Sequence, residues 1–233
     1  MTVCWPIIRP SEVLSKLKIL LVKEFTLELR RKSVISGIAL YMLSLIFIVY
    51  LTFSLRRDTI NEATWSSLFW LTVLFSVVNS VAKSFIGEKR GLAIYYYSIA
   101  SSHLIIISKI LYNSVLCLVL SIAGFILFQV FIDNPVQDYM YFLLLLLLTS
   151  VGFSGALTLI SGIASRASNS NILMAVLSFP VVISILLMAI RVTKNVLDGI
   201  DRAASHDELL NLVAINGIVG TLAWLLFPYI WRS

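Results

Sequence analysis

The chain has 233 residues, of which 59% are hydrophobic and only 13% are charged, and its formal net charge is +6. A soluble globular domain has about 25% charged residues, so this chain has too few charges to cover a water-exposed surface. The same composition excludes a disordered chain, and ten glycines and five prolines exclude a collagen-like one. The remaining class is an all-α, polytopic membrane protein.

Residues 1–33 precede the first long apolar run and form a separate N-terminal element. Apolar residues recur at helical spacing on one face, at Leu14, Leu17, Leu21, Phe25 and Leu29. Basic residues fall seven positions apart on another face, at Lys16, Lys23 and Arg30. This pattern predicts an amphipathic helix over residues 11–33 that lies in the cytoplasmic membrane interface. The alternative is a cytoplasmic extension of the first transmembrane span.

Six apolar runs follow, and each is near the ~20 residues that cross a bilayer as a helix. They cover residues 34–55, 65–86, 109–132, 139–164, 170–190 and 209–230. Barrel strands would be shorter and would alternate in polarity. Pro180 and Pro228 fall inside the fifth and sixth runs, where neighbouring helices can satisfy the freed carbonyl groups. We therefore expect one six-helix transmembrane domain over residues 34–231.

The distribution of basic residues predicts the orientation of these spans. Six spans place both termini on one side, together with the loops at 87–108 and 165–169. That side holds most of the basic residues, namely Arg9, Lys16, Lys18, Lys23, Arg30, Arg31, Lys32, Lys83, Lys89, Arg90, Lys109, Arg166 and Arg232. The positive-inside rule assigns it to the cytoplasm. The net positive charge thus reflects orientation, and a nucleic-acid partner is not needed to explain it.

Ionisable side chains are nearly absent from the spans, which argues against catalysis within the membrane. Lys83 and Lys109 both lie close to the predicted cytoplasmic boundary, where their amines can reach the interface. Intramembrane Asp, Glu and His are missing, which argues against a proton-driven carrier and an intramembrane protease. The chain also lacks a G-x-x-x-x-G-K-[ST] phosphate-binding loop. It is therefore expected to be non-catalytic and to take energy from a partner.

The remaining polar residues indicate packing. Cys4, Cys117, His103 and His206 are isolated from other metal-ligand types, so the chain alone is expected to bind no metal or cofactor. Asn79, Asn113 and Asn216 are expected to bond between helices. Two glycine pairs, Gly152 with Gly155 and Gly217 with Gly220, are expected to mark close helix contacts.

The loop at 87–108 is unusually apolar for a cytoplasmic connection. Its apolar and aromatic residues are Leu92, Ile94, Tyr95, Tyr96, Tyr97, Ile99 and Leu104, and they follow the charged turn Glu88-Lys89-Arg90. A short helix that docks on another protein has such aromatic and arginine anchors. The alternative is a re-entrant segment or an interfacial aromatic belt, which three consecutive tyrosines also fit.

These residues resemble a known family. One stretch of the chain is similar to the second and third spans of the haem exporter B (CcmB) family. It reads Trp70-x4-Phe75-x8-Ser84-Phe85-x2-Glu88-x2-Gly91-Leu92, followed by Lys109-x3-Asn113. Agreement continues at Gly152, Gly155, Arg166 and Pro180, so the resemblance covers essentially the whole chain. It departs at Ala100-Ser-Ser-His103, where family members often have a Pro-x-x-Arg-like patch, and at Leu173-Met-Ala-Val, where they often have an earlier proline.

The resemblance implies an ABC-2-like permease subunit of the ABC transporter for cytochrome c maturation. Such a subunit pairs with an ATPase (CcmA-like), a haem-handling membrane protein (CcmC-like) and a small membrane subunit in the bacterial cytoplasmic membrane, and a homodimer within the complex is expected. ATP acts through the partner, and haem is cargo of the complex. The alternative is an ABC-2 permease that exports a lipid, polysaccharide or drug, and a weaker third reading is a membrane scaffold without transport.

The resemblance also implies a site at which the ATPase docks. The expected docking and coupling residues are Phe85, Glu88, Arg90, Gly91, Tyr95, Tyr96 and Lys109. Within this set, Glu88 matches the family's glutamate and Gly91 follows in a helix-breaking position. We expect the Glu88 carboxylate to pair with an arginine on the ATPase.

Overall fold

The computed structural model describes residues 10–30, 32–56, 60–81, 101–132, 135–165 and 170–232. Every regular element within these ranges is a helix, which confirms the all-α fold. The elements are α1 (Pro10–Arg30), α2 (Lys32–Arg56), α3 (Glu62–Val81), α5 (Ser102–Phe131), α6 (Tyr139–Ala164), α7 (Ser170–Leu197), the 3₁₀ turn η1 (Arg202–Ser205) and α8 (His206–Arg232). Six of them, α2, α3 and α5 to α8, are long and apolar enough to cross a membrane.

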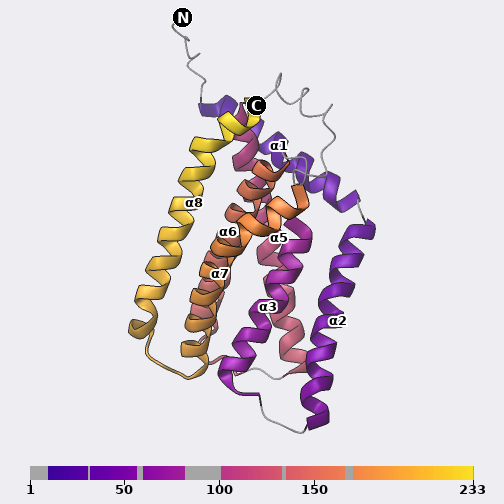
Figure 1. The fold of residues 1–233 in the computed structure, drawn as a ribbon, viewed down its shortest axis with the longest axis vertical. Helices are drawn as coiled ribbons and strands as arrows, with labels where there is room; N and C mark the ends of the chain where they lie inside the picture. Colours follow the sequence, from indigo (N-terminus) through magenta and orange to yellow (C-terminus); the bar gives the residue numbers. More distant parts are fainter. Residues whose placement is uncertain are drawn as a thin grey trace, which may run out of the picture.

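The six long helices run up and down beside one another, and both chain termini lie at the same end of the bundle (Figure 1). We call this the terminal end. At the opposite end, which we call the distal end, α2, α5 and α7 finish and α3, α6 and α8 begin. Helix α1 is separate from α2 and crosses the terminal end obliquely. The arrangement agrees with six spans that return both termini to one side.

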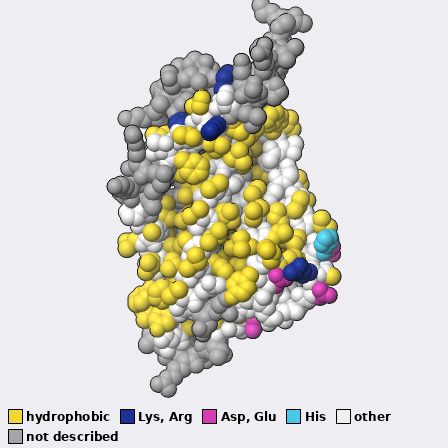
Figure 2. Space-filling model, turned by 180° about the vertical axis from the view of Figure 1, so that it is seen from behind, with side chains coloured by type: hydrophobic (Ala, Val, Ile, Leu, Met, Phe, Trp, Pro, Cys, Tyr) yellow, Lys and Arg dark blue, Asp and Glu magenta, His cyan; other side chains and the backbone are white. Residues whose placement is uncertain are grey.

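Apolar side chains cover the middle of the face shown in Figure 2, and the charged side chains drawn there gather toward the two ends. In water such a surface would be unfavourable, because exposing apolar side chains to water costs free energy. In a bilayer the same side chains face hydrocarbon. The distribution is that of a multi-pass membrane protein.

Two helices begin at side chains that cap them. The side-chain oxygen of Asn61 accepts the backbone N–H of Thr64 at 2.8 Å, so α3 begins directly after it. A carboxylate oxygen of Asp138 accepts the backbone N–H of Tyr141 at 3.2 Å at the start of α6. Capping satisfies backbone donors that the first helical turn leaves free. For α6 the sequence predicted the observed bounds.

Several helices extend beyond the apolar runs that predicted them, and α5 and α7 differ most. Helix α5 begins at Ser102, although the run was expected to begin at residue 109, and α7 continues to Leu197 beyond its expected end at residue 190. In α7 the extension passes through Arg191 and Lys194, which are exposed, while Val192 and Thr193 between them are buried. Charges on the outward side of a helix do not end it, so the helix outlasts the uninterrupted apolar run.

Helix α6 lies at the centre of the bundle and packs against α3, α5, α7 and α8. In the most apolar stretch of α6, 72% of the residues are buried, whereas the corresponding value for α2 is 11%. The buried residues of α6 include many small ones, such as Ser150, Gly152, Ser154, Gly155, Thr158 and Ser161. Small residues let helix backbones approach closely where lipid gives no hydrophobic drive for association.

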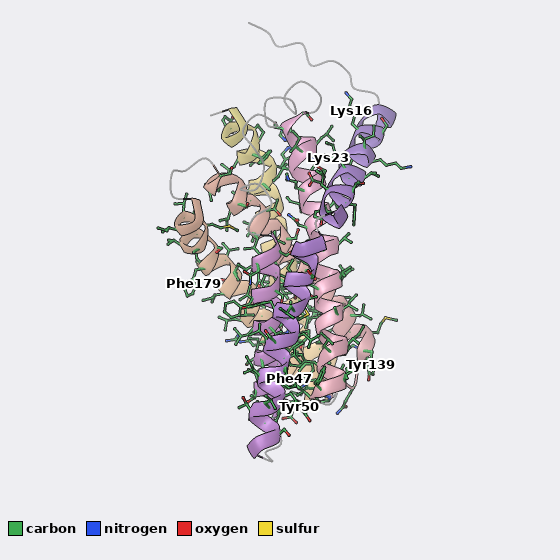
Figure 3. The ribbon with its side chains drawn as sticks, turned by 90° about the vertical axis from the view of Figure 1, so that its right-hand side faces the viewer. Lys16, Lys23, Phe47, Tyr50, Tyr139 and Phe179 are labelled. Carbon is green, nitrogen blue, oxygen red and sulfur yellow. The ribbon has the colours of Figure 1, made fainter. Side chains whose placement is uncertain are left out.

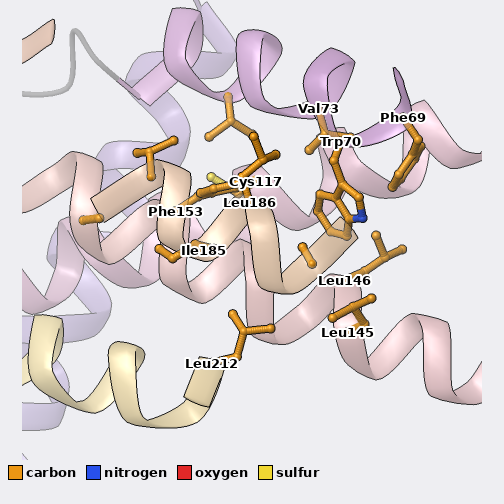
Figure 4. Packing of buried hydrophobic residues seen from close by; sticks show 14 of the residues in the cluster. Phe69, Trp70, Val73, Cys117, Leu145, Leu146, Phe153, Ile185, Leu186 and Leu212 are labelled. Atoms are coloured by element: carbon orange, nitrogen blue, oxygen red, sulfur yellow. The ribbon is translucent and has the colours of Figure 1, made fainter. Parts of the chain in front are cut away.

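An aromatic core fills the distal half. The Trp65 ring stacks on Phe69 with centroids 5.3 Å apart, and Phe69 meets Phe128 edge-on at 5.4 Å. Next to them, the indole N–H of Trp70 donates to the hydroxyl of Thr193 on α7 at 2.7 Å. Figure 4 shows Trp70 among apolar side chains from neighbouring helices. This core ties α3, α5, α6 and α7 together.

The two halves of α7 differ in packing, and Pro180 separates them. In the second half, Ile185, Ala189 and Val192 are fully buried. Of the side chains described in the first half, only Met174 is buried, and Phe179 is 66% exposed at the outer edge of the bundle (Figure 3). A proline inside a helix removes one backbone hydrogen bond, which makes this position a natural bend.

The glycine pairs have different roles. A Cβ atom on Gly152 would lie 2.6 Å from the side-chain oxygen of Asn216, and one on Gly155 would lie 3.2 Å from Val219, so this pair does mark the contact of α6 with α8. The same expectation for Gly217 and Gly220 is wrong within this chain. Both are exposed, and a Cβ there would meet nothing within 4 Å, because that face of α8 points away from the bundle.

Candidate functional site

The best-defined polar contact at the terminal end joins α1 to α5. The Nζ atom of Lys109 lies 3.4 Å from the Oε1 atom of Glu24, and the Nζ atom of Lys23 lies 2.8 Å from the same oxygen. The Lys109 side chain is only 2% exposed and that of Glu24 is 13% exposed. From the sequence, the Lys109 amine can reach the interface. In the structure its side chain is buried against a carboxylate on α1, the helix expected to lie in that interface.

The two lysines keep Glu24 ionised. Burial alone would raise the pKa of the Glu24 carboxyl, but the charges of Lys109 and Lys23 and their hydrogen bonds outweigh burial, so its pKa lies below the ordinary value. A charge brought into a span costs about 3 kcal/mol when it has no counter-charge. Removing one partner of a buried ion pair costs about 3–5 kcal/mol. The Glu24–Lys109 ion pair therefore stabilises the contact between α1 and α5.

An aromatic contact lies beside this ion pair. The ring of Phe25 on α1 meets the ring of Tyr112 on α5 edge-on, with centroids 5.0 Å apart. Edge-on aromatic pairs of this kind contribute about 0.5–1.5 kcal/mol beyond the area they bury. Because Phe25 is adjacent to Glu24, and Tyr112 lies one turn from Lys109, the two contacts together fix both the position and the rotation of α1.

A line of buried polar contacts continues from Lys109 along α5 into the bundle. Asn113, one turn after Lys109, donates to the hydroxyl of Thr158 on α6 at 2.8 Å. Further along, the hydroxyls of Ser114 and Ser154 lie 3.0 Å apart. Each interhelical hydrogen bond in a membrane contributes about 0.6 kcal/mol, so these contacts align α5 with α6 without locking them strongly. This agrees with the expected role of Asn113 between helices.

The other two asparagines differ from each other. The Asn216 amide on α8 donates to the carbonyl oxygen of Leu148 on α6 at 2.9 Å, as expected for an interhelical contact. The Asn79 amide instead donates to the carbonyl oxygen of Phe75 in its own helix, and Asn79 is exposed. The expectation that Asn79 joins two helices is therefore wrong for the part of the chain that the structure describes.

His103 lies near the start of α5, where its ring stacks on the ring of Trp224 of α8 with centroids 4.2 Å apart. The Nδ1 atom of His103 is buried without a hydrogen-bond partner. Among the described residues, no group of three or more His, Cys, Asp or Glu side chains could hold a metal ion. The contact of His103 with Trp224 therefore joins α5 to α8 and is not part of a described metal site.

Most of the docking residues predicted from the sequence lie outside the described residues. These are Phe85, Glu88, Arg90, Gly91, Tyr95 and Tyr96. The chain leaves the described part at Val81, the last residue of α3, and re-enters it at Ser101, just before α5. Both points lie at the terminal end. Of the predicted set, Lys109 is described, and it lies on α5 against α1.

A second ion pair joins two connections at the distal end. The Arg202 guanidinium donates to the Oδ2 atom of Asp138 through Nε at 2.7 Å and through a terminal nitrogen at 2.6 Å. Hydrogen bonds from the Tyr141 backbone and from Arg202 lower the pKa of the Asp138 carboxyl below its ordinary value. Nearby, Gly199 has φ +68°, a conformation that favours glycine, and a Cβ there would lie 2.9 Å from Gln137. These contacts hold the 132–138 and 198–205 connections together.

Sequence reasoning missed the partners in both ion pairs. Glu24 and Lys109 lie on different helices, and Asp138 and Arg202 lie on different connections, so no spacing in the sequence relates them. One signal was available for Glu24, because it is an acidic residue between the basic and apolar faces of the N-terminal helix. A lysine expected inside a span also indicates that a counter-charge lies nearby.

Comparison with known proteins identifies one family. The sequence model for the CcmB protein matches residues 15–227, which is most of the chain. No curated protein and no solved structure gives a significant match.

Proposed function

The chain belongs to the CcmB family, and on that premise we propose that it is the permease subunit on which a separate ABC ATPase acts to release a haem-loaded chaperone in cytochrome c biogenesis. The family is the membrane component of the haem exporter ABC transporter, so the chain is a transmembrane permease component that serves haem transport and cytochrome c biogenesis. The family match is the observation that carries the proposal.

The ATPase would dock at the terminal end. The segment between Val81 and Ser101 joins α3 to α5 there and contains the aromatic residues and the Glu88-Lys89-Arg90 turn. Helix α1 crosses the same end and contacts α5 at Lys109. A partner that pushes on this segment would therefore act on the start of α5 first.

The other components of the complex follow from the family. The chain would bind no cofactor by itself, ATP would bind to the CcmA-like subunit, and haem would be cargo of the complex. A CcmC-like haem-handling protein, a small membrane subunit and a second copy of this chain would complete the assembly. The setting would be the bacterial cytoplasmic membrane.

Both termini would face the cytoplasm, because the terminal end carries most of the basic residues. Cysteines introduced at Asn61 and Ala203, which are exposed at the distal end, should react with an impermeant thiol reagent from outside. A cysteine at Ser101, which is exposed at the terminal end, should not react. Labelling of position 101 from outside would reverse the assigned orientation.

The function is tested by purification of the tagged chain from membranes, alone and with the candidate ATPase. The chain alone should hydrolyse no ATP, and the complex should hydrolyse it. Glu88→Ala should leave the amount of chain in the membrane unchanged but weaken ATPase association and lower c-type cytochrome formation.

The matched control is Glu62→Ala, which removes an exposed carboxylate at the distal end and should change neither ATPase association nor cytochrome levels. Failure of the unaltered chain to co-purify with the ATPase would contradict the proposed function. Normal association and normal cytochrome levels in Glu88→Ala would contradict the role of Glu88 alone.

A further inference from the structure

Apolar packing is a weak explanation for the attachment of α1 to the bundle. Leu20 is the one described apolar side chain of α1 that is buried, while Ile19 and Val22 on the opposite side are 68% and 55% exposed. In a membrane, lipid tails solvate apolar side chains about as well as another helix does, so apolar contact gives little preference for one docking position. Polar and aromatic contacts must therefore specify where α1 lies.

The Glu24–Lys109 contact has the geometry for this role. One oxygen of Glu24 lies between two ammonium groups, 2.8 Å from Lys23 and 3.4 Å from Lys109. Lys23 belongs to α1 itself, so among the described residues Lys109 is the partner that joins the carboxylate to another helix. Lys109 lies about 10 Å along the axis of α5 from the first residue of that helix. Its side chain is almost completely buried. The carboxylate of α1 thus supplies counter-charge to a lysine that a lipid environment would not stabilise.

The contact is also connected to the centre of the molecule. Lys109 and Asn113 are one turn apart on α5, and Asn113 donates to Thr158 of the central helix α6. Phe25 and Tyr112 add an edge-on ring contact beside the ion pair. A displacement of the start of α5 would therefore carry α1 with it.

We propose that Glu24 is a positioning residue which, through Lys109, holds α1 on the start of α5 so that the two helices move as one body when the ATPase acts on the terminal end. This inference rests on the proposed function for the source of the movement, but the attachment itself does not depend on any partner. Lys109 would thus contribute to coupling by binding Glu24 of α1 within the permease.

The attachment is tested in the full chain, in membranes without the ATPase, with the photoreactive residue benzoylphenylalanine in place of Phe25. It should cross-link to the α5 peptide that contains Tyr112. Glu24→Gln should lower the cross-link yield per molecule of chain at least fivefold. Exchange of the charges, Glu24→Lys with Lys109→Glu, should restore the yield to within twofold, because positions 24 and 109 again carry opposite charges. Lys16→Gln, which removes an exposed charge on α1, is the matched control and should have no effect.

Coupling is tested with the same variants in cells that contain the complete complex and the natural Phe25. Glu24→Gln should lower c-type cytochrome per molecule of chain at least fivefold, and the exchanged pair should restore it to within twofold. Normal cross-linking in Glu24→Gln would overturn the attachment. Restored cross-linking without restored cytochromes in the exchanged pair would overturn the coupling role. If the unaltered chain neither binds the ATPase nor supports cytochromes, the proposed function fails while the cross-link result stands.

Discussion

The distal and terminal halves of the bundle are held together by different interactions. The distal half has a stacked aromatic core, a buried hydrogen bond from Trp70 to Thr193, and an exposed ion pair between Asp138 and Arg202. The terminal half has a buried ion pair between Glu24 and Lys109, and the first half of α7 there is largely exposed. Buried apolar residues also lie in the terminal half, where Ile105, Ile106, Leu159, Ala223 and Phe227 form a second cluster. What distinguishes the terminal end is the attachment of α1, which depends on a few polar and aromatic contacts.

The two ion pairs illustrate the same contrast. The exposed pair is the shorter one, at 2.6 Å against 3.4 Å for the buried pair, but the side chain of Arg202 is 65% exposed and that of Lys109 is 2% exposed. An exposed pair is screened by water and salt, whereas the partners of a buried pair depend on each other. Distance alone therefore does not rank the importance of two ion pairs.

The largest loss of stability is expected in the distal core. Trp70→Ala removes a fully buried indole and its hydrogen bond to Thr193, which should destabilise the chain by about 3 kcal/mol or more. Phe179→Ala, at an exposed aromatic position on α7, is the matched control and should change stability little. The measurement is thermal unfolding in detergent micelles. Equal effects of the two substitutions would contradict the packing difference between the halves.

A smaller loss is expected at the contact of α6 with α8. Gly152→Ala places a methyl group 2.6 Å from the Asn216 side chain, so overpacking should cost about 1–3 kcal/mol. Gly217→Ala adds the same methyl group where nothing lies within 4 Å, and it should be neutral or slightly stabilising because alanine favours helix. Thermal unfolding of both variants compares their stabilities directly. If Gly217→Ala lost as much stability as Gly152→Ala, the face of α8 at Gly217 would have to pack against another helix.

Acid should act on the terminal half at a low pH only. The pKa of Glu24 is lowered in the folded chain, so its stabilising effect is fully present above the ordinary glutamate pKa and is lost as the pH falls through the lowered value. The cross-link from position 25 to α5 should be constant from about pH 8 to about pH 5 and should fall below about pH 4. A loss between about pH 7 and about pH 6 would show that another group controls the contact.

The smallest effect is expected at the exposed distal pair. Asp138→Asn removes the charge that faces Arg202 but keeps a side chain that caps α6 equally well. The change in melting temperature should be smaller than that of Gly152→Ala, and high salt should remove the difference from the unaltered chain. A change in melting temperature larger than that of Gly152→Ala would contradict the weak contribution expected of an exposed ion pair.

Much of the fold was predictable because the bilayer restricts a chain to few solutions. The six spans follow from the apolar runs, and α6 was bounded correctly because a capping side chain, Asp138, comes directly before its run. The start of α5 and the end of α7 were missed. In α7 the reason is that a helix with charges on its exposed face continues past the apolar run, as at Arg191 and Lys194.

The site was less predictable because it depends on which way each helix faces. Gly152-x-x-Gly155 and Gly217-x-x-Gly220 are the same pattern in sequence, and only the rotation of α8 decides that one pair is buried and the other exposed. Lys109 was identified, but its partner Glu24 lies on another helix and could not be found from spacing. The predicted residues of the 87–108 segment that precede Ser101 lie outside the described structure, so their docking role stays a prediction.

The claim that ATP acts on the terminal half and leaves the distal half unchanged is tested most directly by hydrogen exchange of the complete complex in lipid nanodiscs, with and without ATP. We expect ATP to change exchange in α1, in residues 101–113 and in residues 170–180. Peptides over residues 62–73 and 135–146 should exchange at the same rate in both states. An ATP-dependent change of equal size in these distal peptides would contradict the account.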